Sequence, residues 1–180
     1  MLRIIVSGDE FFDDEEQTFS TVGDVTLDLE HSLVSLSKWE SEYQKPFLSA
    51  GEKTREETLG YVRAMLLTPD VDLNVFDRFS SEDFDRINSY IESKESATTF
   101  GMMPQSNSRG EVITSELIYY WLVAFNIPFE CETWHLNRLF SLIRICNVKN
   151  SKPKKMSRHE IAQRNRELNA QRRAATGSSG

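Results

Sequence analysis

The sequence predicts a mainly α-helical fold: a helical domain with a central antiparallel helical hairpin, a small N-terminal β element and a basic C-terminal helical tail. Three observations support this fold class. Apolar residues recur at helical spacing in several segments that follow helix-capping residues. Strand-like alternation is confined to the first 30 residues. The charge balance changes sign near residue 150.

The central hairpin is predicted from residues 114–148. Thr114 or Ser115 can cap a helix, and nine consecutive apolar residues then run from Leu117 to Phe125. Nine is far fewer than the roughly 20 residues that span a bilayer. The run therefore predicts a helix buried on nearly all sides. Asn126 and Pro128 end it.

A second helix is predicted to begin near Glu132. One of its faces is apolar at helical spacing, and comprises Leu136, Leu139, Phe140, Ile143 and Cys146. The turn between the two helices looks short, so we expect them to be antiparallel neighbours. We interpret this hairpin as the core of the domain.

The N-terminal β element is predicted from two segments. Leu2–Val6 has the composition of a short strand, and Val25, Leu27 and Leu29 alternate with polar residues. Two strands alone are marginally stable, so we expect them to form a hairpin or sheet that packs on the helices.

Three further helices are predicted before the hairpin, each from a capping residue at its start. Ser32 caps a helix that ends at Tyr43. Thr54 and Glu57 form a capping box at the start of a second helix, and Ser80 with Ser81 opens a third. Between them, residues 70–79 are predicted to be a loop. Residues 93–110 are polar, contain glycine and proline, and predict a long mobile loop.

The charge pattern divides the chain into an acidic body and a basic extension. Residues 1–150 carry 13 Lys or Arg and 26 Asp or Glu, a net charge of −13. Residues 151–180 carry eight Lys or Arg and two Glu, a net charge of +6. We therefore expect a helical domain over residues 1–150 and a helical or disordered extension over residues 151–180, with a helix near residues 158–173.

The basic extension is a candidate for contact with something anionic. Its cations are typical of phosphate-neutralising side chains, but no aromatic residue is present on which a base would stack. A solubilising end, or an intramolecular partner for the acidic body, is the alternative. The basic residues are Lys152, Lys154, Lys155, Arg158, Arg164, Arg166, Arg172 and Arg173.

Metal and catalytic sites are weakly indicated. Cys131, His135 and Cys146 are potential zinc ligands, and the fourth would be His31, His159 or a carboxylate from elsewhere. No Cys-x-x-Cys is present, and packed core residues are the favoured interpretation. Asp70, Asp72 and Asn74 resemble the start of a calcium loop, yet Val75 and Ser81 stand where glycine and glutamate are required. No glycine-marked nucleophile, phosphate loop or dinucleotide motif occurs. We therefore predict a protein that is not an enzyme and has no cofactor or metal.

Aromatic residues of the central hairpin are candidates for partner binding, because such residues anchor interfaces. Core packing is the alternative for residues inside so apolar a run. The candidate partner-binding residues are Tyr119, Tyr120, Trp121, Phe125, Trp134, Leu139 and Phe140.

The second half of the chain resembles a known family. The stretches YYWLVAFNIPFECETWHLNRLFSLIRICN (119–147) and KKMSRHEIAQRNRELNAQRRA (154–174) resemble the tail assembly chaperones of long-tailed, siphovirus-type bacteriophages. The likeness covers about residues 113–174, and the first 30 residues lie outside it. The resemblance implies a mostly helical protein without catalytic residues. It also implies that the protein binds the phage tape-measure protein, keeps it soluble and delivers it while the tail tube polymerises around it.

The resemblance further implies a location in the host cytoplasm and absence from the mature virion. The sequence itself shows no signal peptide and no run long enough for a membrane span. A structural virion protein of the tail or neck, self-association, contact with the tail-tube protein, and a nucleic-acid-binding accessory protein are the alternatives.

Overall fold

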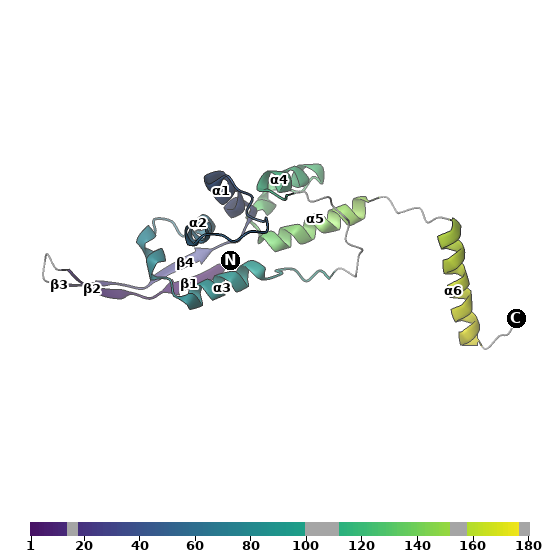
Figure 1. Cartoon of the computed structure of the whole chain (residues 1–180), viewed down its shortest axis with the longest axis horizontal. Helices are drawn as coiled ribbons and strands as arrows, with labels where there is room; N and C mark the ends of the chain where they lie inside the picture. Colours follow the sequence, from purple (N-terminus) through teal and green to yellow (C-terminus); the bar gives the residue numbers. More distant parts are fainter. Residues whose placement is uncertain (14–17, 100–111, 152–157, 177–180) are drawn as a thin grey trace. The chain divides into compact units, whose positions relative to one another are not determined.

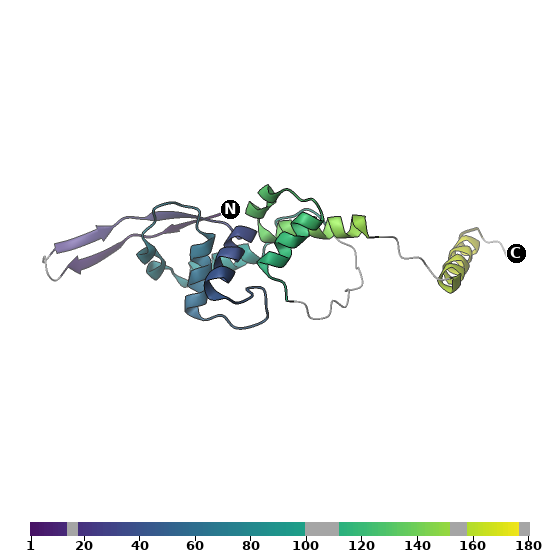
Figure 2. The same ribbon diagram turned by 90° about the horizontal axis from the view of Figure 1, so that it is seen from above.

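The computed structural model describes residues 1–13, 18–99, 112–151 and 158–176, with residues 9–22 described by their backbone alone. The chain divides by its contacts into two compact units, Met1–Asn147 and Val148–Gly180. The first unit combines N-terminal strands with helices, as Figures 1 and 2 show. The predicted mainly helical fold with a small N-terminal β element is confirmed.

The N-terminal residues form a two-stranded antiparallel ribbon. Strand β1 (Leu2–Val6) pairs with β4 (Val25–Leu29), and β2 (Asp9–Asp13) pairs with β3 (Thr18–Val22). Both pairings keep one register, since Leu2 lies opposite Leu29 and Asp9 lies opposite Val22. The predicted strands β1 and β4 are therefore present, whereas β2 and β3 were not predicted, because their residues lack a clear apolar alternation.

The first hydrophobic cluster forms where one face of β1 and β4 meets helices. Arg3 and Asp28 point away from this face and form an exposed ion pair of 2.7 Å. On the opposite face Ile4, Val6, Leu27 and Leu29 are buried, as the alternation predicts, whereas Leu2 and Val25 at one end of each strand are partly buried. Helices α2 (Arg55–Met65) and α3 (Ser81–Glu92) complete this cluster. Its buried members are Ile4, Val6, Leu27, Leu29, Trp39, Tyr61, Val62, Met65, Val75, Phe76 and Ile87.

Side-chain caps set the helix starts. Ser32 caps α1 (Leu33–Tyr43), Thr54 caps α2 and Ser80 caps α3, each accepting from the backbone N–H three residues on. These predicted starts are confirmed. The loop predicted over residues 70–79 is partly wrong, because Leu73–Arg78 forms the 3-10 helix η1. The side chains of Val75 and Phe76 are buried in the first cluster and hold this 3-10 helix against it.

The second hydrophobic cluster is built from α1, α4 (Ser115–Ala124), η2 (Phe129–Thr133) and α5 (Leu136–Asn150). The hairpin therefore supplies one of two clusters rather than the whole core, which corrects the sequence interpretation. Its buried members are Leu33, Leu36, Ile118, Leu122, Ile127, Cys131, Leu136, Leu139 and Ile143.

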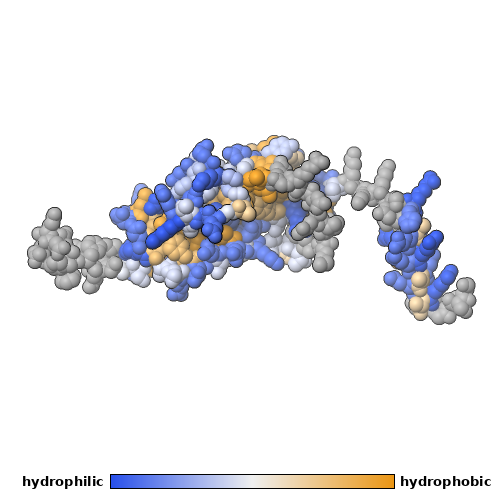
Figure 3. All heavy atoms as spheres, viewed as in Figure 1, coloured by the Kyte–Doolittle hydropathy of each residue, from blue (hydrophilic) through white to orange (hydrophobic). Residues whose placement is uncertain are grey.

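Three details of the predicted hairpin are wrong. The connection is not a short turn, because residues 125–135 contain η2 and α5 begins only at Leu136. The closest helical neighbour of α4 is α1 rather than α5. Nor is α4 buried on nearly all sides: Tyr120 and Val123 are 63% and 60% exposed. Figure 3 shows hydrophobic residues at the surface over α4.

Two buried histidines join the clusters. The backbone N–H of Leu136 donates to the carbonyl of His31 at 2.7 Å, where α5 begins. The rings of His31 and His135 meet edge to face with centroids 5.1 Å apart. His31 Nδ1 is hydrogen-bonded to the Tyr61 hydroxyl at 2.5 Å, and His135 Nε2 to the carbonyl of Tyr90 at 3.0 Å. Elements of both clusters therefore converge on this pair.

The second unit contains α6 (Arg158–Thr176), whose start agrees with the predicted helix and whose end lies three residues further on. Every side chain of α6 that the structure describes is exposed. Within the described segments, no helix is both long and apolar enough to cross a membrane.

A buried carboxylate links α1 to α4, and its removal tests that link. Glu40 accepts hydrogen bonds from the backbone N–H groups of Ser115 (2.7 Å) and Phe47 (2.9 Å). We predict that Glu40→Ala lowers the free energy of unfolding by about 3 kcal/mol, because two N–H donors lose their acceptor. Urea denaturation measures the change. Glu42→Ala, an exposed carboxylate on the same helix, is the control and is expected to change stability by less than about 0.5 kcal/mol.

The histidine pair predicts a loss of stability in mild acid. Burial, and then the neighbouring His135, lower the pKa of His31 from 6.5 to about 4. The unfolded chain therefore binds this proton first, so stability is complete above about pH 6.5, falls as the pH drops toward 4, and then levels off. The protonation of His31 therefore lowers the free energy of unfolding by roughly 3 kcal/mol between neutral pH and pH 4.

Urea denaturation between pH 7 and pH 4 measures this dependence. His31→Gln is expected to flatten the pH profile, whereas His159→Gln, an exposed histidine on α6, is expected to leave it unchanged. An unaltered profile in His31→Gln would assign the acid sensitivity to other groups.

Candidate functional site

The candidate site lies along α5, beside α4. Leu136, Leu139 and Ile143 of α5 point into the second hydrophobic cluster. The same helix carries Phe140, which is half-buried, and Arg144, which is exposed. Two hollows lie along this part of α5, and Phe140 and Arg144 line both of them.

The first hollow, called here the apolar groove, lies between α4 and α5. It has a volume of about 440 Å³. Three aromatic rings form its wall and two polar side chains lie at its edge. Trp121, Phe125 and Phe140 are each half-buried, so part of each side chain is accessible from the groove. The residues that line the groove are Trp121, Phe125, Phe140, Ile143, Arg144 and Asn147.

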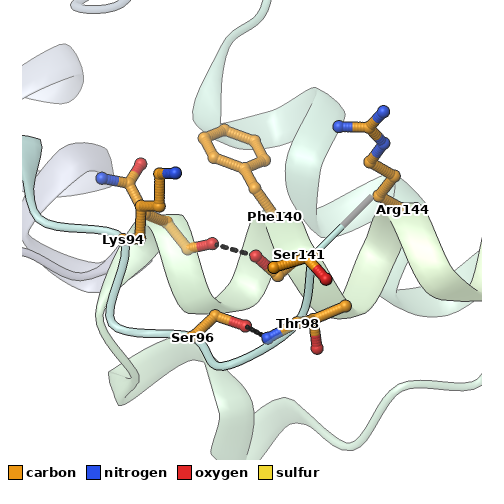
Figure 4. Close-up of a pocket in the computed structure, with 8 residues that line it drawn as sticks. Lys94, Ser96, Thr98, Phe140, Ser141 and Arg144 are labelled. Atoms are coloured by element: carbon orange, nitrogen blue, oxygen red, sulfur yellow. Dashed lines mark hydrogen bonds between the residues drawn. The ribbon is translucent and has the colours of Figure 1, made fainter. Parts of the chain in front are cut away.

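The second hollow, called here the polar hollow, lies between α5 and the segment that follows α3. It has a volume of about 460 Å³. In Figure 4 the Phe140 ring lies between the side chains of Lys94 and Arg144, and all three point to the same side. The residues that line the hollow are Lys94, Ser96, Thr98, Thr99, Asn137, Phe140, Ser141 and Arg144.

Asn137 holds the two walls of the polar hollow together. Its amide nitrogen donates to the carbonyls of Ile91 (2.9 Å) and Ser93 (2.8 Å), at the end of α3. Its own carbonyl accepts from the Ser141 hydroxyl at 2.9 Å, a contact drawn in Figure 4. The chain that leaves α3 is thereby fixed on α5, and Lys94 is brought to the Phe140 side chain.

The electrostatics of the two hollows differ from those of the body around them. Among the residues that the structure describes, no Asp or Glu lines either hollow. The charged residues of α5 are Arg138, Arg144 and Lys149, all positive. Residues 1–150 as a whole carry a net charge of −13. The described lining of the site therefore combines apolar side chains with the cations Lys94 and Arg144.

The structure separates the seven candidate partner-binding residues into groups. Trp121, Phe125 and Phe140 come together in the apolar groove. Leu139 is completely buried in the second cluster. Tyr120 is 63% exposed and is not among the residues that line the groove.

Tyr119 and Trp134 take part in polar contacts beside the groove. The Tyr119 hydroxyl donates to the Glu132 carboxylate at 2.8 Å. Burial, and then this carboxylate, raise the pKa of Tyr119 to about 12. The Arg138 guanidinium lies over the Trp134 ring, 4.1 Å from its centroid. Both aromatic side chains thus have structural partners within the fold.

The basic extension is described only in part. Lys152, Lys154 and Lys155 lie outside the described residues. Arg158, Arg166 and Arg173 fall on one side of α6 at helical spacing, and all are exposed. Arg164 and Arg172 are also exposed on this helix, and both take part in interactions.

The residues considered as metal ligands serve packing and hydrogen bonding. Cys131 is buried in the second cluster, where burial raises the pKa of its thiol. Asp72 caps η1 by accepting from the backbone N–H of Asn74 at 3.0 Å. Across the part of the chain that the structure describes, no three His, Cys, Asp or Glu side chains are grouped to hold a metal ion.

Sequence reasoning missed Lys94, Ser96 and Thr98, because a polar segment between two helices predicts a loop. Arg144 lies outside the apolar face of its helix, so the spacing of apolar residues does not indicate it. Lys94 is placed near α5 by the hydrogen bond from Asn137 to the carbonyl of Ser93, which is more than 40 residues away in the sequence. The residues around Lys94 do not predict this long-range contact.

The Asn137 contacts predict a testable weakness. We expect Asn137→Ala to lower the free energy of unfolding by about 1–2 kcal/mol, because the carbonyls of Ile91 and Ser93 lose their donor. We also expect faster tryptic cleavage after Lys94, which mass spectrometry of the digest would quantify. Asn147→Ala, an exposed amide on the same helix, is the control. Equal cleavage rates in both variants would contradict a holding role for Asn137.

The chain was compared with protein-family models, curated proteins and solved structures. No protein-family model, no curated protein and no solved structure matches this chain. The likeness of residues 113–174 to tail assembly chaperones therefore stays a resemblance. The functional proposal is based on the groove and hollow along α5.

Proposed function

We propose that this protein is a non-enzymatic binding protein, a phage tail assembly chaperone that holds helical segments of the tape-measure protein in the apolar groove. The observation that carries the proposal is the groove itself. Three half-buried aromatic rings, Trp121, Phe125 and Phe140, line a hollow of about 440 Å³ between α4 and α5.

A groove of this kind suits an amphipathic helix. A bound helix buries its apolar stripe against the ring faces and leaves its polar side in water. Trp and other large aromatic residues contribute most to such interfaces, because each buries a large area with few rotatable bonds. Ile143 extends the apolar floor, and Arg144 with Asn147 provides a polar edge.

A tape-measure protein has the properties that such a groove requires in a client. It is a long helical chain, and its apolar stripes aggregate unless they are covered before the tail tube assembles. Transient cover by a soluble protein prevents this aggregation. The strong negative charge of residues 1–150 favours solubility of the complex. The proposed site of action is the host cytoplasm, and the proposed fate is absence from the mature virion.

Two other functions remain as alternatives. A structural component of the tail or neck would be retained in purified virions, where mass spectrometry would detect it. Nucleic-acid binding through α6 is favoured by the one-sided placement of Arg158, Arg166 and Arg173. Such binding would weaken steeply with salt, in proportion to the phosphates contacted.

Co-expression with the tape-measure protein of the same genome tests the proposal. We expect soluble co-purification that survives high salt, because apolar contacts are not screened. The double variant Trp121→Ala/Phe140→Ala is expected to lower the co-purified amount roughly tenfold or more, as the loss of central aromatic anchors does. Ile5→Ala, which removes an exposed apolar side chain from β1, is the control and should retain binding.

Circular dichroism of each variant separates loss of binding from loss of fold. Wild-type co-purification by a folded Trp121→Ala/Phe140→Ala variant would move the contact away from the groove. Failure of the wild-type chain to co-purify, with nucleic acid carried through at low salt, would favour the α6 alternative.

A further inference from the structure

A further hollow, called here the core pocket, opens onto the first hydrophobic cluster, where residues of α2 and α3 line it together. It has a volume of about 230 Å³. Its described lining shares no residue with the apolar groove or the polar hollow. Tyr61 and Val62 of α2 and Ile87 of α3 are buried and form its floor. Phe47 and Phe84 are half-buried and add aromatic rings to its wall.

The Phe47 ring is held firmly in its place in this wall. It stacks on the Tyr61 ring, with centroids 3.8 Å apart and planes inclined by 22°. The Trp39 ring meets it edge to face at a centroid distance of 5.0 Å. The backbone N–H of Phe47 also donates to the Glu40 carboxylate at 2.9 Å. A ring with these contacts loses little freedom when a ligand packs on it, so the wall is preorganised for binding.

Two polar side chains offer donors to a ligand in the core pocket. The Lys53 ammonium lies over the Phe47 ring, 4.4 Å from its centroid, and this lysine is half-buried. The Asn88 side chain lines the same pocket from α3, and its amide carries two N–H groups. The Thr58 hydroxyl is already used within α2, because it donates to the carbonyl of Thr54 at 3.0 Å. A ligand near the Phe47 ring therefore meets a positive charge and an amide donor.

We propose that the core pocket binds a small aromatic carboxylate, with its ring packed on Phe47 and its carboxylate directed to Lys53. The geometry assigns Phe47 as the ring platform, Lys53 as the anion-binding residue and Asn88 as a second donor. The inference is independent of the proposed function, because the tape-measure segment is assigned to a different hollow with different residues.

The volume of the core pocket limits the size of the ligand. An apolar cavity of about 150 Å³ holds one benzene molecule, so about 230 Å³ holds a ring system near the size of indole with a short substituent. Protein interiors are close-packed, and the atoms that line an unfilled apolar hollow forgo dispersion contacts that a ligand would restore. A flat ring restores them best here, since it stacks on the face of Phe47.

The charge of Lys53 selects the substituent on that ring. A carboxylate accepts a charge-assisted hydrogen bond from an ammonium group, and such bonds are stronger than those between neutral groups. An amine on the ring would instead meet like charge beside Phe47. The partial burial of Lys53 reduces the screening of either interaction by water.

Three probes with one ring and different charges test the proposal: indole-3-acetate, indole and tryptamine. NMR titration of the full chain measures affinity and location together, because Val62, Ile87 and Ile91 line the core pocket whereas Ile143 lines the apolar groove. We expect indole-3-acetate to shift the methyl resonances of the core pocket with a Kd of about 1 mM or lower. It should bind about threefold more tightly than indole, and tryptamine should bind most weakly.

Three variants locate the ring and the carboxylate. Lys53→Met should lower the affinity for indole-3-acetate about threefold and leave that for indole unchanged, because it removes the charge and keeps an apolar side chain. Lys38→Met, at an exposed lysine of α1, is the matched control and should bind as the wild-type chain does. Thr58→Leu fills part of the pocket and should lower the affinity for all three probes. Circular dichroism confirms that each variant is folded.

Each other outcome overturns a stated part of the inference. Unshifted Val62, Ile87 and Ile91 methyl resonances in the folded wild-type chain, at several millimolar of every probe, refute binding in the core pocket. Full affinity in a folded Thr58→Leu variant refutes it as well. Equal affinity for indole-3-acetate and tryptamine refutes the assignment of Lys53. Co-purification with the tape-measure protein is a separate measurement, so failure of this inference is distinguishable from failure of the proposed function.

Discussion

The hydrogen bond from the N–H of Leu136 to the carbonyl of His31 fixes where α5 begins, and the position of the candidate site depends on it. The same place holds the edge-to-face histidine pair, so the two hydrophobic clusters meet at a polar junction. Buried polar groups are costly unless they are paired. No buried side-chain nitrogen or oxygen atom in the described residues lacks a hydrogen-bond partner, so this cost is met throughout.

The candidate site follows from this junction. With α5 started at Leu136, its buried residues face the second cluster, and Phe140 and Arg144 are left at the surface. Asn137, one residue further on, then reaches the end of α3 and brings Lys94 beside Phe140. An apolar wall from α4 and a cationic wall from the segment after α3 thus meet along a single helix.

Local signals account for the parts of the fold that could be predicted from sequence. Ser32, Thr54, Ser80 and Thr114 each cap a helix by a contact within four residues, so the pattern of residue types was sufficient. The connection over residues 125–135 could not be predicted in the same way, because a short 3-10 helix is too brief to show a repeating pattern of apolar residues. Only part of the candidate site could be predicted from the sequence. Its aromatic residues lie in an apolar run, but Lys94 is placed beside them by the long-range hydrogen bonds of Asn137.

Helix α1 gives buried residues to both clusters, Leu33 and Leu36 to one and Trp39 to the other. The two halves of the first unit are therefore not separable modules. A gene fragment that combines α1 with only the strands, or with only α4 and α5, would leave one face of α1 without its partner. Recombination within this unit would be tolerated only where α1 keeps both neighbours, which confines the evolutionary exchange of its parts to the connections outside that helix.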